Sequence, residues 1–161
     1  MNEPVQENKR KLPLTVINTN ARSLCPKINS LVDCLADMEA SIATVTETWF
    51  TDGESLEEDA QDLLLRAGLR IMYRNREANV RGFSHGGVAI IYKDSVCSLN
   101  RMKLHNPHDF EVIAASGVIK GCQRKIVIIA SYIPPNYSVG RGKAAMDFVA
   151  CLLYTSPSPR D

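Results

Sequence analysis

Apolar and polar residues follow the period of a strand in some stretches of the chain and the period of a helix in others. Residues 14–17 form a short β-rich run, and the Asn, Ser and Arg side chains of residues 18–24 favour a turn after it. Pro26 suits the first turn of a helix. The residues that share the spacing of one buried helix face are Ile28, Leu31, Val32, Leu35 and Met38. Residues 42–46 return to β-branched side chains, so the pattern predicts a strand, a helix and a second strand.

The order of these elements predicts where chemistry would lie. A strand, a helix and a strand in succession favour a right-handed crossover, whose two strands end at the same edge of a sheet. Asn20 and Glu47, the polar residues where the two strands end, should therefore emerge side by side. Ligands of open α/β sheets bind at this carboxyl edge.

A second amphipathic helix and further strands are predicted downstream. Ser55 and Glu58 form a capping box, and Gly68 is a natural residue to end the helix. The apolar stripe of this helix consists of Leu56, Ala60, Leu63, Leu64 and Ala67. Alternating or apolar runs then predict strands at residues 69–74, 87–92, 110–118 and 125–133. Short connections favour antiparallel pairing, so the predicted fold class is α+β, with mixed sheet character and helices on the outside.

Composition narrows the class of protein. The 161 residues are 45% hydrophobic, which is enough for the core of one domain, and a net charge of +1 argues neither for nor against a polyanionic partner. Residues 1–12 are polar, form no secretory signal and are expected to be disordered. The longest apolar run, residues 126–130, is far shorter than the roughly 20 residues that span a bilayer. Five scattered cysteines without a CxxC pair favour reduced thiols. We therefore expect an intracellular protein without a membrane segment.

Four short motifs, in order along residues 14–136, resemble a known family. They are residues 20–24 (NARSL) with Lys27, 46–49 (TETW), 86–90 (GGVAI) and 131–136 (SYIPPN). Together they resemble the N-terminal part of the endonuclease/exonuclease/phosphatase superfamily, which is DNase I-like, in the version carried by non-LTR (LINE-type) retrotransposons. One motif alone would be weak, whereas the order and spacing of four make the match specific. The resemblance implies the first half of a four-layer α/β sandwich built on two sheets.

The resemblance also implies roles for three residues. Glu47 would be a ligand of Mg²⁺ or Mn²⁺, because hard carboxylate oxygens suit such ions. Asn20 would hydrogen-bond metal-bound water or the catalytic residues, and Tyr132 would offer its phenol to the phosphate. The residues alone leave a plainer alternative for each: a surface glutamate, a turn asparagine and a half-buried strand tyrosine.

Arginines form a second group of candidates. Between residues 66 and 81 there are five arginines and one acid, Glu77. Guanidinium groups pair with phosphate oxygens in a bidentate manner, so contacts with a DNA backbone are one interpretation and ordinary surface arginines are the other. Such contacts would position the backbone and would not read bases. The candidates for phosphate contact are Arg22, Arg74, Arg76 and Arg81.

The end of the chain departs from the family pattern. The family completes its site with a Gly-Asp-x-Asn type motif and a later Asp-His pair, which the resemblance places downstream of this sequence. Residues 143–150 resemble the start of the family's next helix, whereas residues 151–161 (CLLYTSPSPRD) match the translation of a sequencing adapter. We therefore interpret residues 13–150 as a truncated domain and residues 151–161 as an artefact.

These interpretations lead to one expected function and one alternative. The chain is expected to be a fragment of a Mg²⁺-dependent DNA endonuclease that nicks target DNA for retrotransposition and that is inactive as truncated. Its partner would be DNA, with a reverse transcriptase domain downstream in the parent protein, which would need access to the nucleus. The alternative is a non-catalytic remnant or a binding module of the same fold.

Overall fold

The strand–helix–strand unit expected near the N-terminus is present in the computed structural model, which describes residues 14–50, 56, 58–76, 85–106, 110–122 and 124–155. The elements in chain order are β1 (Val16–Asn20), the 3-10 helix η1 (Cys25–Lys27), α1 (Ile28–Asp37), β2 (Ile42–Thr46), α2 (Glu58–Arg66), β3 (Leu69–Arg74), β4 (Val88–Lys93), β5 (Cys97–Arg101), β6 (Glu111–Ile119), β7 (Arg124–Tyr132) and α3 (Val139–Thr155). The chain therefore alternates helices and strands first and then continues mainly with strands.

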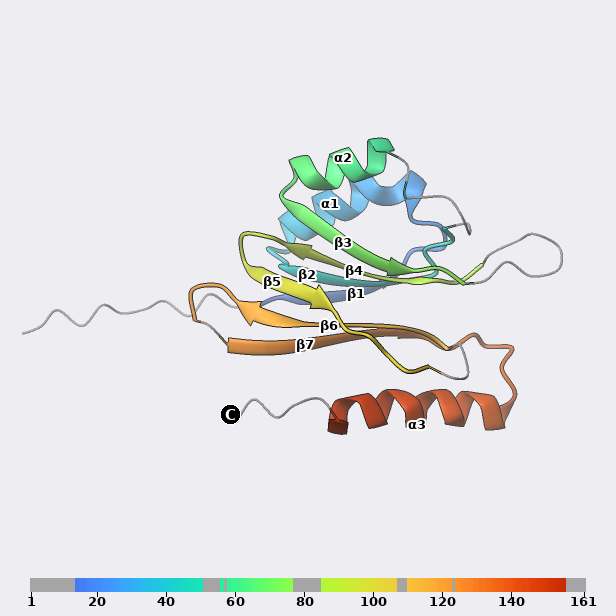
Figure 1. Ribbon diagram of the computed structural model, residues 1–161. Coiled ribbons are helices and arrows are strands. Elements are labelled where there is room, and N and C mark those ends of the chain that lie inside the picture. The colour runs from blue at the N-terminus through green and yellow to red at the C-terminus, as the bar shows by residue number, and fades with distance from the viewer. Residues whose placement is uncertain are drawn as a thin grey trace, which may run out of the picture.

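Two sheets stack face to face between helices (Figure 1). The first sheet has the strand order β1-β2-β4-β3, and the second has the order β5-β6-β7. β1 and β2 pair in parallel, as the crossover requires, and every other pairing is antiparallel. Helices α1 and α2 cover the outer face of the first sheet, and α3 covers the outer face of the second. The predicted α/β sandwich with outer helices is confirmed.

Each interface between layers has its own apolar cluster. The side chains packed between the first sheet and helices α1 and α2 include Leu24, Leu35, Val45, Leu64 and Ile91. Those between the two sheets include Ile42, Val88, Ile90 and Ile113. The third cluster lies between the second sheet and α3 and includes the buried residues Phe110, Val112 and Ala145. Because successive side chains of a strand point to opposite faces, a strand with both faces covered is apolar throughout, which is why β4 is buried along five of its six residues.

The boundaries show where sequence patterns mislead. β2 has the predicted bounds, whereas β1 lies two to three residues later than predicted. β5 was not predicted, because only Cys97 and Leu99 face the core and polar residues alternate with them. Ser55, which belongs to the predicted capping box, lies outside the described residues, as do residues 1–13. α3 begins before residue 143 and continues to Thr155. Leu152 of this helix packs against the apolar cluster beneath the second sheet.

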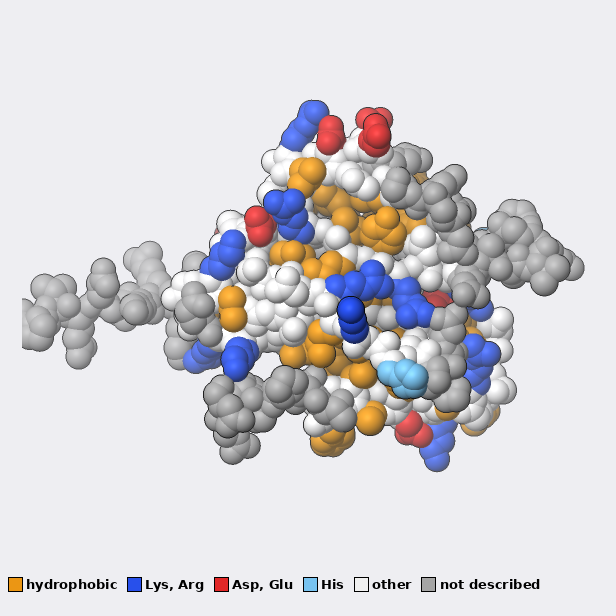
Figure 2. Space-filling model, in the orientation of Figure 1, with side chains coloured by type: hydrophobic (Ala, Val, Ile, Leu, Met, Phe, Trp, Pro, Cys, Tyr) orange, Lys and Arg blue, Asp and Glu red, His pale blue; other side chains and the backbone are white. Residues whose placement is uncertain are grey.

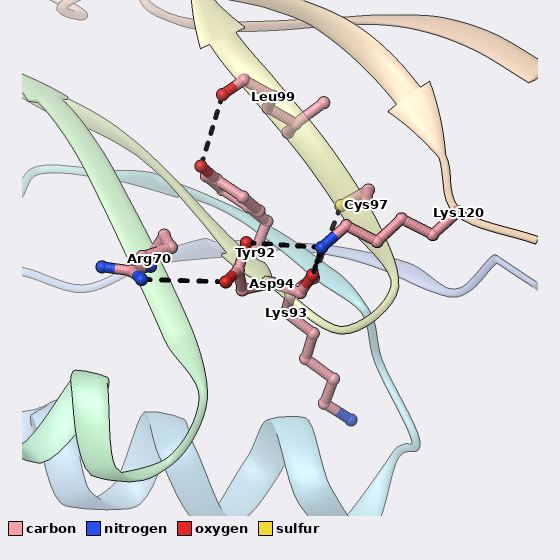
Figure 3. Close-up of polar contacts among 7 residues, drawn as sticks. All are labelled: Arg70, Tyr92, Lys93, Asp94, Cys97, Leu99 and Lys120. Carbon is pink, nitrogen blue, oxygen red and sulfur yellow. Dashed lines mark hydrogen bonds and ion pairs between the residues drawn. The ribbon is translucent and has the colours of Figure 1, made fainter. Parts of the chain in front are cut away.

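A polar cluster joins the two sheets at the end opposite to Glu47 (Figure 3). Asp94, in the turn after β4, lies 3.7 Å from Arg70 of the first sheet and 3.8 Å from Lys120 of the second. Tyr92 donates a hydrogen bond to the Leu99 carbonyl across the same turn. The ion pairs are solvent-exposed and contribute little stability, so the apolar cluster between the sheets provides most of the packing there.

Two further expectations concern the whole chain. None of the helices among the described residues is long and apolar enough to cross a membrane. The structure describes all five cysteines and shows no disulfide among them, and Cys97 is the one that is buried. Burial raises the pKa of the Cys97 thiol, which keeps this group protonated at neutral pH.

Candidate active site

Parallel strands β1 and β2 bring Asn20 and Glu47 together. Asn20 is in register with Thr46, so Glu47 is the first residue beyond the shared edge. The Asn20 side chain hydrogen-bonds the Glu47 carboxylate, and its Oδ1 also accepts a hydrogen bond from the Arg22 backbone N–H at 3.2 Å. The expectation that the two side chains emerge side by side is confirmed.

Tyr132 reaches the same carboxylate from the second sheet. It is the last residue of β7, and its hydroxyl donates a hydrogen bond to Glu47 Oε1 at 2.7 Å. The two residues are 85 positions apart in sequence. The three candidate residues Asn20, Glu47 and Tyr132 therefore form one cluster at one end of the sandwich.

The two ionisable groups of the cluster shift in opposite directions. Hydrogen bonds from Asn20 and Tyr132, helped by the positive charge of Arg22, lower the pKa of Glu47 against the opposing effect of burial. Burial, together with the hydrogen bond to the Glu47 carboxylate, raises the pKa of Tyr132 to about 12. At neutral pH the cluster therefore contains an ionised carboxylate and a protonated phenol.

Backbone strain gathers at the same edge. Arg22, Ser23, Glu47 and Trp49 all have positive φ angles, and Glu39 is the remaining non-glycine residue of this kind among the described residues. Such conformations are costly and persist where surrounding contacts hold them. The Ser23 N–H donates to the Glu47 carbonyl at 3.0 Å, and the Leu24 N–H donates to the Thr48 carbonyl at 3.0 Å. The turn after β1 thus holds the backbone that carries the carboxylate.

The candidate arginines separate into different environments. Arg22 is exposed beside Glu47, and Lys27 fixes its turn by donating hydrogen bonds to the carbonyls of Ala21 and Arg22. Arg74 is half-buried at the end of β3, and Arg76 is paired with Glu111 at 3.3 Å. Arg81 lies outside the described residues. Among the candidates that the structure describes, Arg22 is the cation that acts on the Glu47 carboxylate.

Basic side chains extend beyond the predicted set. Figure 2 shows Lys and Arg side chains gathered on the visible face near the ends of β3 and β5. Arg101 is the last residue of β5, and its guanidinium donates to the Tyr73 carbonyl at 3.1 Å. Sequence reasoning missed Arg101 because the strand that carries it was not predicted.

Glu111 is the second residue that sequence reasoning left without a role. It is 4% exposed at the start of β6, and it is in register with Tyr132. The sequence did contain a signal, which was a charged residue beside Phe110 at the start of an apolar strand. A carboxylate buried at such a position needs polar partners.

A pocket of about 340 Å³ opens beside the cluster. It lies between β1 and the start of α1, and both Asn20 and Lys27 line it. The remaining lining is largely apolar and includes Ile17, Leu24 and Leu31. Glu47 itself does not line this pocket, which touches the cluster only through Asn20.

The donor set fits a hard divalent cation. Mg²⁺ takes one or two carboxylates, and water and substrate phosphate complete its octahedral shell. Glu47 supplies one ionised carboxylate, and the Asn20 side chain hydrogen-bonds it. The lowered pKa of Glu47 keeps this carboxylate charged at neutral pH.

Comparison with known proteins places the fold. No family model matches the sequence, and no curated protein sequence is significantly similar to it. The human nocturnin catalytic domain with bound sulfate is 14% identical, with a TM-score of 0.64, over 88% of this chain and 58% of that one. An AP endonuclease from Archaeoglobus fulgidus is 16% identical, with a TM-score of 0.61, over 89% of this chain and 52% of that one. The 3′ phosphatase NExo from Neisseria, bound to a product DNA hairpin, is 18% identical, with a TM-score of 0.56, over 88% of this chain and 52% of that one.

These similarities cover nearly all of this chain but only part of each solved structure. The chain spans between 52% and 58% of their lengths, so roughly half of the sandwich is represented. The TM-scores of 0.56 to 0.64 show a shared fold at sequence identities of only 14% to 18%. This chain therefore has the DNase I-like α/β sandwich fold of the endonuclease/exonuclease/phosphatase proteins.

Proposed function

We propose that this chain is part of a metal-dependent DNA endonuclease of the LINE retrotransposon type. The observation that carries the proposal is the ionised Glu47 carboxylate, held by Asn20 and Tyr132 where strands of both sheets end. The fold is shared with an AP endonuclease and with a phosphatase bound to DNA, which supports phosphodiester chemistry. The four motifs at residues 20–24, 46–49, 86–90 and 131–136 support the retrotransposon subtype.

Each residue of the cluster has a distinct task in this proposal. Mg²⁺ or Mn²⁺, when bound at Glu47, would supply positive charge that neutralises a scissile phosphate. Asn20 orients the carboxylate through its side-chain hydrogen bond. Tyr132 keeps its proton, because its pKa of about 12 lies far above neutral pH, and so remains a hydrogen-bond donor at the site. Arg22 adds a positive charge at the exposed side, where a DNA phosphate could approach.

The remaining catalytic groups would come from the rest of the whole protein. The resemblance implies a Gly-Asp-x-Asn motif and a later Asp-His pair, and this chain spans about half of its structural neighbours. We therefore expect residues 1–161 to bind metal weakly and to cleave no DNA. In the whole protein, DNA would be the substrate, a reverse transcriptase domain would follow, and nuclear access would be required.

Metal binding and cleavage test the proposal in two steps. Trp49 is the only tryptophan of the chain and lies two residues from Glu47, so quenching of its fluorescence by Mn²⁺ reports on binding at this edge. Glu47→Gln should lower the Mn²⁺ affinity about tenfold or more, because it removes the charged ligand. In a domain completed from the genomic reading frame beyond Ala150, Glu47→Ala should lower Mg²⁺-dependent plasmid nicking by about a hundredfold or more.

The control is Glu39→Gln, which removes an exposed carboxylate at the opposite end of β2. This variant should bind Mn²⁺ and nick plasmid like the original chain. Equal Mn²⁺ affinity and equal nicking with and without the Glu47 carboxylate would refute the proposed role. A completed domain that binds Mn²⁺ but never nicks would support the non-catalytic module instead.

A further inference from the structure

The buried carboxylate of Glu111 is held by two polar partners. Its Oε2 accepts a hydrogen bond from the Gly87 backbone N–H at 2.6 Å, and its Oε1 lies 3.3 Å from Arg76 Nε. The side chain of Glu111 is 4% exposed, whereas that of Arg76 is 36% exposed. Arg76 also donates to the His85 carbonyl at 3.2 Å. A charge buried this deeply is tolerated because it is paired and hydrogen-bonded.

Glu111 lies directly against the glycine turn that precedes β4. Gly86 and Gly87 have φ angles of 118° and 84°, conformations that side chains disfavour. A Cβ atom at Gly86 would lie 2.5 Å from Glu111 Oε2, and one at Gly87 would collide with the Thr48 hydroxyl. The carboxylate, the turn and the exit of β2 are therefore packed without space for a further side chain.

The Gly86–Gly87 turn also holds the backbone just after Glu47. The Trp49 N–H donates to the Gly86 carbonyl at 2.9 Å, and the Thr48 N–H donates to the Gly87 carbonyl at 3.4 Å. Glu47 and Trp49 both have the left-handed conformation that needs such support. Glu111 is also the register partner of Tyr132, which hydrogen-bonds the Glu47 carboxylate from the other sheet.

We propose that Glu111 is a positioning residue, which anchors the Gly86–Gly87 turn and thereby fixes the backbone from which the Glu47 carboxylate reaches the metal. The inference rests on the proposed function of Glu47 as a metal ligand. It makes Arg76 the counter-ion of Glu111 and not a phosphate contact. Buried ion pairs often contribute little net stability, so the main effect of Glu111 is expected on the geometry at Glu47.

The variant Glu111→Gln in the full 161-residue chain tests this inference. Glutamine keeps the size of the side chain but loses the charge that pairs with Arg76 and that strengthens the bond from Gly87. The Trp49 amide should exchange its hydrogen at least about tenfold faster, while the Ile90 amide in the middle of β4 should keep its protection. The Mn²⁺ affinity, read from Trp49 fluorescence, should fall about tenfold. Glu39→Gln is the matched control and should change neither quantity.

A second variant covers the case in which Glu111→Gln does not fold. The double change Glu111→Met and Arg76→Met removes both charges, keeps comparable side-chain size and leaves no buried charge without a partner. It should show the same faster exchange at Trp49 and the same loss of Mn²⁺ affinity. In either folded variant, an unchanged Trp49 exchange rate overturns the proposal. Faster Trp49 exchange with unchanged Mn²⁺ affinity also overturns it, because the turn would then not position the ligand.

Failure of the proposed function has a different signature. If Glu47→Gln leaves Mn²⁺ affinity unchanged, Glu47 is not the metal ligand, and the metal-positioning role of Glu111 falls with it. The exchange rate at Trp49 in the Glu111 variants is measured without metal. An increase there would still establish the mechanical link from Glu111 to the backbone after β2.

Discussion

Tyr132 and Glu47 stabilise each other in opposite protonation states. The phenol donates a hydrogen bond that is strongest when the carboxylate is ionised, so this bond contributes, after Asn20, to the lowered pKa of Glu47 and, after burial, to the raised pKa of Tyr132. Burial adds to the shift of the phenol and opposes that of the carboxylate. The contact between the two sheets thus acts together with the Asn20 hydrogen bond in lowering the pKa of Glu47, and it keeps a donor beside the carboxylate.

This contact predicts a loss of stability in alkaline solution. The folded pKa of Tyr132 is raised from 10.0 to about 12, so its contribution is fully present below pH 10 and is lost as the pH rises through 12. In urea unfolding, the advantage of the original chain over Tyr132→Phe should therefore shrink between these two pH values. The difference in phenolate absorbance between the two chains should have its midpoint near 12. A midpoint near 10.0 would show that Tyr132 does not bond the carboxylate.

Helix α1 shows how far periodicity describes an element. Ile28, Leu31 and Leu35 are buried against the first sheet, as their spacing predicts. Met38 continues the same spacing but is 54% exposed, because α1 ends at Asp37 and the backbone reverses at Glu39, where φ is positive. The apolar pattern therefore predicts the buried face of the helix correctly and its last turn wrongly.

Two matched truncations test this description of α1. Leu35→Ala should lower the free energy of unfolding by about 2–5 kcal/mol, because Leu35 is only 1% exposed and its truncation opens a cavity in the core. Met38→Ala should cost less than about 1 kcal/mol, because the side chain is largely in water already. Chemical denaturation of both variants measures the difference. Similar costs at the two positions would mean that Met38 is part of the core.

At the scale of the whole molecule, strand β1 forms an open edge of the first sheet. Among the described residues, β1 is one of the two edge strands of the first sheet, and its Val16 side chain is 47% exposed. The chain spans about half of its structural neighbours. The unpaired backbone N–H and C=O groups of an edge strand are a template for pairing with another chain.

Self-association through this edge is therefore expected for residues 1–161. Val16→Lys should shift the chain toward the monomer, because a charged side chain on an edge strand opposes pairing. Sedimentation velocity over a range of concentrations measures the shift. Val139→Lys is the control, because Val139 is 91% exposed on α3 and belongs to no strand. An equal effect of both changes would attribute the association to net charge.

Local pattern was sufficient for much of the fold. β-branched residues predicted β2 at its observed bounds, and the strand–helix–strand order predicted that β1 and β2 would be parallel neighbours. Asn20 and Glu47 were predicted to lie together for the same reason. By contrast, β5 escaped prediction because its polar residues dilute the apolar signal. Residues such as Arg81 and Ser55 lie outside the described residues, so predictions that involve them stay predictions.

The sequence by itself determined the elements whose residues are close along the chain, because the period of apolar residues records which side of a helix or strand is buried. It also placed Asn20 and Glu47 at one edge, because a crossover between parallel strands leaves little choice. Only the tertiary structure decided that Tyr132 bonds Glu47 and that Glu111 anchors the turn beside it. Those contacts depend on how two separately paired sheets stack, and no period along the chain records that arrangement.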